Sequence, residues 1–146
     1  MRALSIRQPY AELILRGIKT VELRSRATLI VGERFWIYAS KQKPGAASHR
    51  PVVGENIDGV QPPLWMIELA EQVKMIEPDA LLPTGVIVGS AEIARCELLV
   101  ARGNGQPATS NPQQASIYQW HLTHVERART LRKPRRHPQP VWFRPF

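Results

Sequence analysis

The chain has 146 residues, of which 43% are hydrophobic and 22% charged, and its formal net charge is +8. A chain of this length is expected to form one domain, residues 1–146, and to bury roughly two-thirds of the surface that its unfolded form exposes. Cys96 is its one cysteine, so an intrachain disulfide is excluded and a cysteine-based zinc site is not expected. Because no apolar run is long enough to span a bilayer and no signal-peptide pattern opens the chain, we expect a cytoplasmic protein without a membrane partner.

The positive charge is concentrated near the C-terminal end. Residues 121–146 contain seven basic residues against Glu126 alone, a local charge of +6, whereas residues 1–120 carry +2. Such a surplus favours a polyanionic partner, although ordinary basic proteins also show it. RNA is the partner we expect first, with single-stranded DNA or a nucleoside as alternatives.

Residues 4–24 are predicted to form a strand, a short helix and a second strand. Polar and apolar residues alternate over residues 4–7, the period of a half-buried strand. Pro9 suits the first turn of a helix, and Gly17 suits the left-handed turn that ends one. One face of this helix is apolar, formed by Tyr10, Leu13 and Ile14.

The strand predicted over residues 20–24 has one apolar and one polar face. Its polar face presents a hydroxyl, a carboxylate and a guanidinium in a row, from Thr20, Glu22 and Arg24. Lys19 stands directly before this row, where the helix exits. The row is therefore the first candidate site.

Two motifs in this unit resemble the opening of an ASCH domain, namely RQPY at residues 7–10 and GIKTVELR at residues 17–24. The run at residues 83–92 also resembles the strand that follows the middle helical region of that family. The resemblance implies an α+β, mainly β fold, a β-barrel of the PUA-like type with packed helices. It also implies a cleft that holds RNA or a nucleobase.

The middle of the chain alternates between strands and loops. Residues 34–39 carry bulky side chains on both faces and are predicted to form a central strand. Ser40 and Lys41 follow it, and the resemblance places this strand end beside the cleft. Residues 41–63 have the composition of a long surface loop, and apolar spacing over residues 64–76 predicts a second amphipathic helix.

Residues 86–96 form the strongest β pattern in the chain. Gly89 and Ala91 either leave room for a close neighbour or mark a bulge that bends the strand. Residues 103–114 have the composition of an exposed loop.

The C-terminal part is predicted to be extended throughout. Tyr118, Trp120 and Leu122 alternate with polar residues as in a strand. Three prolines exclude a helix over residues 132–140, and residues 141–143 are predicted to form a closing strand.

The candidate cleft has two interpretations. One is a solvated strand face, on which Glu22 forms ordinary ion pairs. The other, favoured by the resemblance, is a polar cleft in which Lys19 and an arginine bind phosphate, Glu22 accepts a hydrogen bond from a nucleobase amine and Thr20 supplies a hydroxyl. The residues assigned to this cleft are Arg7, Gln8, Lys19, Thr20, Glu22, Arg24, Ser40 and Lys41.

The same residues bear on catalysis. The resemblance extends to acetylcytidine amidohydrolases, which have a lysine followed three residues later by a nucleophilic threonine. Here Glu22 stands three residues after Lys19, and Thr20 only one, so a threonine mechanism is not expected. A lysine and a carboxylate still provide acid and base groups when burial shifts their pKa values, so Lys19, Thr20 and Glu22 are the candidates for an amidohydrolase. For a ribonuclease the candidates are Lys19, Tyr38 or Lys41.

The basic run near the C-terminus is a second candidate nucleic-acid contact. The run extends from Arg127 to Arg136, and Trp120 and Trp142 flank it in the sequence. The residues assigned to the contact are Arg132, Lys133, Arg135 and Arg136. Aromatic rings beside guanidinium groups bind single-stranded nucleic acids by stacking and phosphate contact. The alternatives are a solvated surface segment whose aromatic neighbours belong to the core, and a surface that meets an acidic protein partner.

No cofactor is expected. His121 and His124 are three residues apart, but no carboxylate or cysteine joins them at metal-ligand spacing, so no metal site is expected either. The sequence also has no phosphate-binding glycine loop followed by Lys and Ser or Thr, and no dinucleotide-binding fingerprint.

Overall fold

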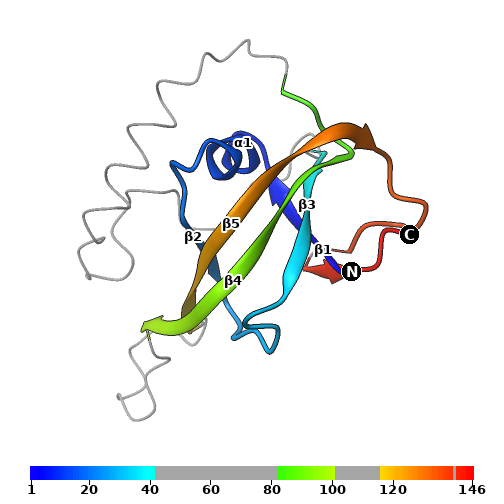
Figure 1. The fold of residues 1–146 in the computed structure, drawn as a ribbon. Helices are drawn as coiled ribbons and strands as arrows, with labels where there is room; N and C mark the ends of the chain where they lie inside the picture. The colour runs from blue at the N-terminus through cyan, green and yellow to red at the C-terminus, as the bar shows by residue number, and fades with distance from the viewer. Residues whose placement is uncertain (42–81, 101–115, 140) are drawn as a thin grey trace, which may run out of the picture.

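The computed structural model describes residues 1–41, 82–139 without 101–115, and 141–146. These residues form six strands and one helix, which are labelled in Figure 1. The elements are β1 (Ala3–Arg7), α1 (Tyr10–Leu15), β2 (Val21–Arg24), β3 (Arg34–Ser40), β4 (Val86–Val100), β5 (Ile117–Arg132) and β6 (Trp142–Phe143). The predicted helix at 64–76 and the predicted loops at 41–63 and 103–114 lie outside the described residues, apart from Lys41.

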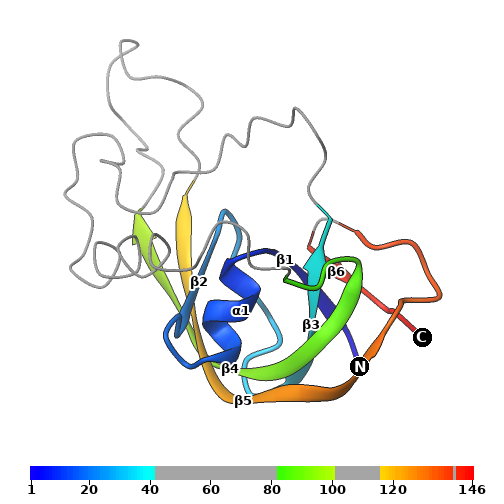
Figure 2. The same ribbon diagram turned by 90° about the horizontal axis from the view of Figure 1, so that it is seen from above.

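The strands form one mixed sheet in the order β2-β5-β4-β3-β1-β6. β1 and β3 are parallel, and the other neighbours are antiparallel. The predicted strand at residues 34–39 is therefore central, as expected, because β3 lies between β4 and β1. The long strands β4 and β5 connect the two ends of the sheet and curve around α1 (Figure 2).

Side chains bridge the two ends of this curved sheet. Arg24 of β2 donates a hydrogen bond of 2.8 Å to the backbone oxygen of Ser5 in β1. The Trp120 ring of β5 stacks on the Trp142 ring of β6, with centroids 5.5 Å apart and planes at 6°. Since β2 and β6 are not paired with each other, the sheet of the described residues is strongly curved but open.

This architecture confirms the mainly β fold and corrects two details of the expectation. A closed barrel is not found in the described part of the chain, because its ladder ends at β2 and β6. Several packed helices are not found there either, since α1 is its one helix. The alternation in residues 4–7 and 20–24 predicted strands correctly, but it carried no information on whether the first and last strands would meet.

Helix α1 is bounded as the sequence predicted. Pro9 occupies its N-cap position, and Gly17 has the left-handed φ of +73° that ends it. The side chain of Gln8 connects the helix start to the rest of the fold, because its Oε1 accepts a 3.1 Å hydrogen bond from the Glu12 N–H and its Nε2 donates at 3.0 Å to the Pro83 oxygen.

Hydrophobic clusters cover both faces of the sheet. In β3, Phe35 and Ile37 belong to the main core, on the face that α1 covers. Tyr38 and Phe143 belong to a smaller cluster on the opposite face, against which Trp36 packs. The period of two along a strand explains this division, and it is why both faces of the predicted strand are bulky.

The sequence offered two explanations for Gly89, a close neighbour or a bulge. Both are correct. The register between β4 and β5 shifts between Ile87 and Gly89. A Cβ atom on Gly89 would lie 2.4 Å from the Glu126 oxygen and 2.4 Å from Leu15 Cδ2. Helix α1 and strand β5 can approach this point only because the side chain is absent.

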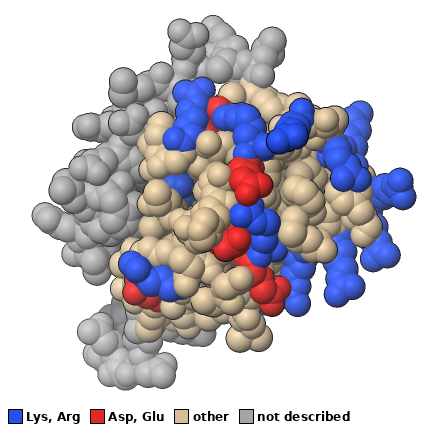
Figure 3. All heavy atoms as spheres, in the orientation of Figure 1, with Lys and Arg blue, Asp and Glu red and all other residues tan. Residues whose placement is uncertain are grey.

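Residues 133–139, which follow β5, contain no helix, as their prolines predicted, and the chain bends at Arg135 and Arg136. The basic side chains of this segment are exposed, and in Figure 3 blue side chains project from one side of the molecule where no red is visible. The closing strand is confirmed, because β6 pairs with β1 through Ala3 opposite Phe143.

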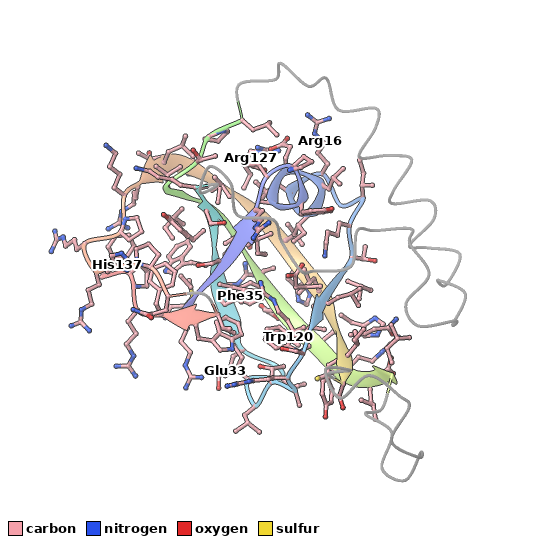
Figure 4. All side chains as sticks on the ribbon, turned by 180° about the vertical axis from the view of Figure 1, so that it is seen from behind. Arg16, Glu33, Phe35, Trp120, Arg127 and His137 are labelled. Atoms are coloured by element: carbon pink, nitrogen blue, oxygen red, sulfur yellow. The ribbon has the colours of Figure 1, made fainter. Side chains whose placement is uncertain are left out.

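One ion pair connects α1 to β5. Arg127 donates two hydrogen bonds to the Glu12 carboxylate, at 2.8 and 3.0 Å, and Arg16 donates a third at 2.8 Å. Figure 4 shows Arg127 and Arg16 beside this helix. The Arg127 hydrogen bonds hold the pKa of Glu12 below its ordinary value, against the effect of its burial, with Arg16 contributing less.

Removing this pair tests its contribution to stability. The pKa of Glu12 is lower in the folded protein than the ordinary carboxyl value of 4.5. The pair therefore stabilises the fold fully at pH values above 4.5, and this stabilisation is lost as the pH falls through the lowered pKa. Arg127→Met should lower the free energy of unfolding by about 1 kcal/mol at pH 7, since Arg127 is half exposed and water screens the pair. Urea unfolding between pH 3 and pH 8 measures the difference.

Arg16→Met is the matched control, because Arg16 contributes one hydrogen bond from an exposed position within the helix. It should cost about 0.3–0.5 kcal/mol. A cost of Arg127→Met that stayed constant down to pH 3 would contradict the assignment to an ionised Glu12.

Candidate functional site

The polar row of β2 faces the interior of the fold. The exposed fractions of Lys19, Glu22 and Arg24 are 6%, 6% and 7%. Charged side chains are almost never this buried unless they are paired. The interpretation of the row as a solvated strand face therefore fails for these three residues.

The three buried side chains form a chain of ion pairs. Lys19 Nζ lies 2.7 Å from Glu22 Oε2, and Arg24 Nη2 lies 2.9 Å from Glu22 Oε1. Lys19 Nζ also donates to the backbone oxygen of Val21. The Glu22 carboxylate thus bridges two cations in a site from which water is largely excluded.

Arg24 has donor capacity beyond these contacts. Its Nη2 is used by Glu22 and Ser5, and its guanidinium carbon lies 5.9 Å from the centre of the Trp120 ring. Its Nε and Nη1 are buried and have no hydrogen-bond partner among the residues that the structure describes. Buried donors without partners are costly and are uncommon in folded proteins, so they call for an explanation such as a bound ligand.

Tyr10 joins this site, although the sequence placed it only on the apolar face of the helix. The pKa of its phenol is raised, first by burial and then by the Glu22 carboxylate, while Arg7 acts in the opposite direction. The phenol is therefore close enough to Glu22 and Arg7 for their charges to act on it. Periodicity assigned Tyr10 to packing, and its ring does pack against the main core. Its place in the RQPY motif was the one available signal for the additional effect of Glu22 and Arg7.

The other predicted cleft residues have different roles. Gln8 is buried, and its side chain holds the start of α1. Thr20 is exposed, and its backbone oxygen accepts a hydrogen bond from the Leu122 N–H at 2.8 Å. Thr20 is therefore not enclosed with the three buried charges, and the Gln8 side chain is engaged by backbone groups around α1.

Arg7, Ser40 and Lys41 lie at one end of the sheet. Arg7 and Ser40 are paired in the register of β1 and β3 and are both half-buried. Lys41 is exposed, and a Cβ atom on Gly85 would lie 2.7 Å from its Cε. The structure therefore brings Arg7 and Ser40 together at the adjacent ends of β1 and β3.

The basic residues Arg132, Lys133, Arg135 and Arg136 are all exposed. The Arg132 guanidinium lies 4.1 Å from the centre of the Phe146 ring. Trp120, in contrast, is 1% exposed, and Trp142 packs against it and against Phe35 in the core, where Figure 4 labels Trp120 and Phe35. Trp120 is therefore a core residue, and the half-buried Trp142 stacks one ring face on it.

The two histidines near the end of the chain each pair with a carboxylate. His121 Nε2 lies 2.8 Å from Glu97, and His124 Nδ1 lies 2.9 Å from Glu92. Within the described residues, no three His, Cys, Asp or Glu side chains are grouped so that they could hold a metal ion. No helix in that part of the chain has the length and apolar character to cross a membrane.

Comparisons with known proteins place this fold. The model of the ASCH domain family matches residues 4–132. The crystal structure of ASCH from Zymomonas mobilis superposes with a TM-score of 0.51 at 16% identity, covering 98% of this chain and 87% of that one. The crystal structure of the ZmASCH S128A mutant protein from the same organism gives a TM-score of 0.50 at 19% identity, with the same coverage. None of the curated proteins matches the chain.

Proposed function

The chain belongs to the ASCH domain family, and we propose that it binds RNA, or a nucleoside derived from RNA, at the buried site formed by Lys19, Glu22 and Arg24. The observation that carries this proposal is the Arg24 guanidinium, whose buried Nε and Nη1 have no partner among the described residues. Each is an N–H donor of a charged group, and such donors suit a phosphate oxygen or an acceptor atom of a base.

The chemistry of the neighbouring groups supports the same class of ligand. The three side chains carry two positive charges and one negative charge, which favours an anionic ligand. Glu22 is an acceptor for an exocyclic amine, and Tyr10 adds a phenol that can donate or accept. The curved sheet, whose two ends are bridged by side chains, also suits the open PUA-like barrel in which we propose this site lies.

The basic segment of Arg132, Lys133, Arg135 and Arg136 would extend the contact along the phosphate backbone. Such contacts supply affinity without sequence preference, because every nucleotide carries the same phosphate. We place this activity in the cytoplasm, where the free thiol of Cys96 is also expected.

Arg24→Lys tests the proposal with little change in charge. Lysine keeps the positive charge but lacks the planar guanidinium with its several donors, so we expect single-stranded RNA to bind about tenfold more weakly. Fluorescence anisotropy with a labelled RNA oligonucleotide measures the affinity, and thermal unfolding confirms that the variant is folded. Arg26→Lys is the matched control, because Arg26 is exposed two residues further along and should leave the affinity unchanged. Equal affinities for wild type and Arg24→Lys would contradict the site.

An enzyme on the same site is the second candidate function. Lys19 Nζ and Glu22 Oε2 are 2.7 Å apart, a distance across which a proton can be exchanged. Cleavage of RNA, or hydrolysis of an amide on a modified nucleoside such as acetylcytidine, would use these groups, whereas the exposed Thr20 does not support a threonine nucleophile. Incubation with labelled RNA and with acetylcytidine distinguishes binding from turnover, since turnover should disappear in Glu22→Gln.

A further inference from the structure

A surface pocket lies where β4 and β5 lose their regular pairing. Ile87 pairs with Arg132, but Gly89, two residues further, pairs with Arg127, so the intervening residues of β5 bulge away from β4. The pocket formed there has a volume of about 300 Å³ and lies between the bulge and the C-terminal residue. Its wall includes Trp36, Ile87, Glu126, Arg129, Arg132 and Phe146.

This pocket is on the opposite face of the sheet from the buried ion-pair site. Trp36 and Ile87 belong to the smaller hydrophobic cluster, with Tyr38 and Phe143. Arg24 instead contacts Trp120, which belongs to the main core beneath α1. The pocket is therefore separate from the site proposed above.

The charge of the pocket is unbalanced. Arg127 is neutralised by Glu12, and Glu126 is paired with Arg34 at 3.3 Å. The Arg129 side chain is exposed and has no ion pair or hydrogen bond within the described residues, and the Arg132 guanidinium, which has no carboxylate partner there, lies over the Phe146 ring. Two arginines without a carboxylate favour an anionic ligand.

The apolar wall adds a surface for a flat ring. Phe146 is 41% exposed, and Trp36 is half-buried beside the same opening. A volume of about 300 Å³ is at the small end of the range for small-ligand pockets and suits one base with its sugar. Guanidinium groups beside exposed rings are the combination that binds single-stranded nucleic acid.

We propose that this pocket is a second RNA contact, which takes one unstacked base against Phe146 and Trp36 while Arg129 and Arg132 bind the adjacent phosphates. The inference rests on the proposed RNA-binding function and adds to it a second face of the sheet. Lys133, Arg135 and Arg136 continue the positive surface beyond Arg132, so a single strand leaving the pocket would follow the basic segment.

Two substitutions test the two parts of the contact separately. Phe146→Ala removes a stacking surface, so single-stranded RNA should bind about tenfold more weakly with an unchanged salt dependence. Arg129→Ala removes a phosphate contact, so the slope of log K against log salt should become shallower by about 0.7. Anisotropy titrations of a labelled single-stranded RNA at several salt concentrations measure both quantities.

Arg95→Ala is the matched control, because it removes an exposed arginine of β4 that does not line the pocket. Its slope should equal that of wild type. Ultraviolet cross-linking of the bound RNA, followed by peptide mapping, should find adducts on Trp36 or Phe146 in wild type.

The outcomes separate this inference from the proposed function. If both pocket variants kept the affinity and the salt slope of wild type, the proposed RNA contact at the pocket would be wrong. Weak binding by Arg24→Lys in the same experiment would still support the buried site. If wild type bound no RNA, both proposals would fall. Polyglutamate tests an acidic protein partner. If it bound wild type, bound Arg129→Ala more weakly and was not displaced by RNA, the pocket would be assigned to a protein partner instead.

Discussion

Replacing Glu22 with alanine is expected to lower the free energy of unfolding by about 3–5 kcal/mol. The Glu22 carboxylate lies 2.7 Å from Lys19 Nζ and 2.9 Å from Arg24 Nη2, and all three side chains are buried. Removing it would leave two cations in a region of low dielectric without the carboxylate that bridges them. Guanidinium-induced unfolding of wild type and variant at pH 7 measures the difference.

Glu126→Ala is the control for this prediction. The Glu126 side chain is 71% exposed and pairs with Arg34 at 3.3 Å, so water already screens its charge. Its loss should cost less than about 1 kcal/mol. If Glu22→Ala cost no more than Glu126→Ala, the buried ion-pair chain would contribute no more to stability than a surface pair.

Replacing Gly89 with alanine is expected to cost about 3 kcal/mol, the upper part of the range for overpacking. The new Cβ atom would lie 2.4 Å from a backbone oxygen and 2.4 Å from Leu15 Cδ2. Leu15 Cδ2 is the end of a flexible side chain and can rotate away, but the Glu126 oxygen belongs to the backbone and moves only with β5, so the bulge itself would have to open. Urea unfolding monitored by tryptophan fluorescence gives the loss of stability.

Gly32→Ala separates crowding from backbone strain. A Cβ atom on Gly32 would meet nothing within 4 Å, but its φ of +82° is unfavourable for alanine. We expect a cost of about 1–2 kcal/mol from strain alone. Should Gly32→Ala prove the more damaging of the two substitutions, close packing at Gly89 would not be what the bulge requires.

The two proposed RNA contacts would contribute different properties. Arg24, Lys19 and Glu22 are held in fixed positions away from water, where hydrogen bonds to a base are strong and mismatched groups are costly. The exposed arginines at the bulge and beyond it would contact phosphates, and the affinity that they contribute would depend on salt. Selectivity for a base would therefore come from the buried site, and much of the affinity from the opposite face.

Local sequence signals predicted most of the described elements. Alternation identified the strands at 4–7, 20–24, 34–39 and 86–96, because a half-buried or central strand restricts the residue types on each face. Pro9 and Gly17 bounded the helix through backbone chemistry that does not depend on the rest of the fold. The prolines of the C-terminal segment excluded a helix for the same kind of reason.

The buried ion-pair chain consists of Lys19, Glu22 and Arg24 from the predicted row, but the sequence did not predict its burial. Periodicity placed Glu22 and Arg24 on one face of a strand, together with Thr20, without showing what covers that face. The structure buries Glu22 and Arg24 and leaves Thr20 exposed. The burial of Glu22 and Arg24 depends on which strands lie across the curved sheet from β2. The hydrogen bond from Arg24 to Ser5 shows this, because it joins β2 to β1, which are far apart in the strand order.

By itself, the sequence determined most of the strands, the short helix with its ends and the positive charge that favours a polyanionic partner, because these follow from neighbouring residues, while the family resemblance implied the mainly β class. Only the tertiary structure decided that Glu22 and Arg24 of β2 would be buried and that Arg24 would keep two donors unpartnered within the described residues. It also decided that the Glu22 charge would act on Tyr10 and that a bulge opposite Gly89 would open a pocket. Each depends on contacts between segments far apart in the chain, and local periodicity does not encode them.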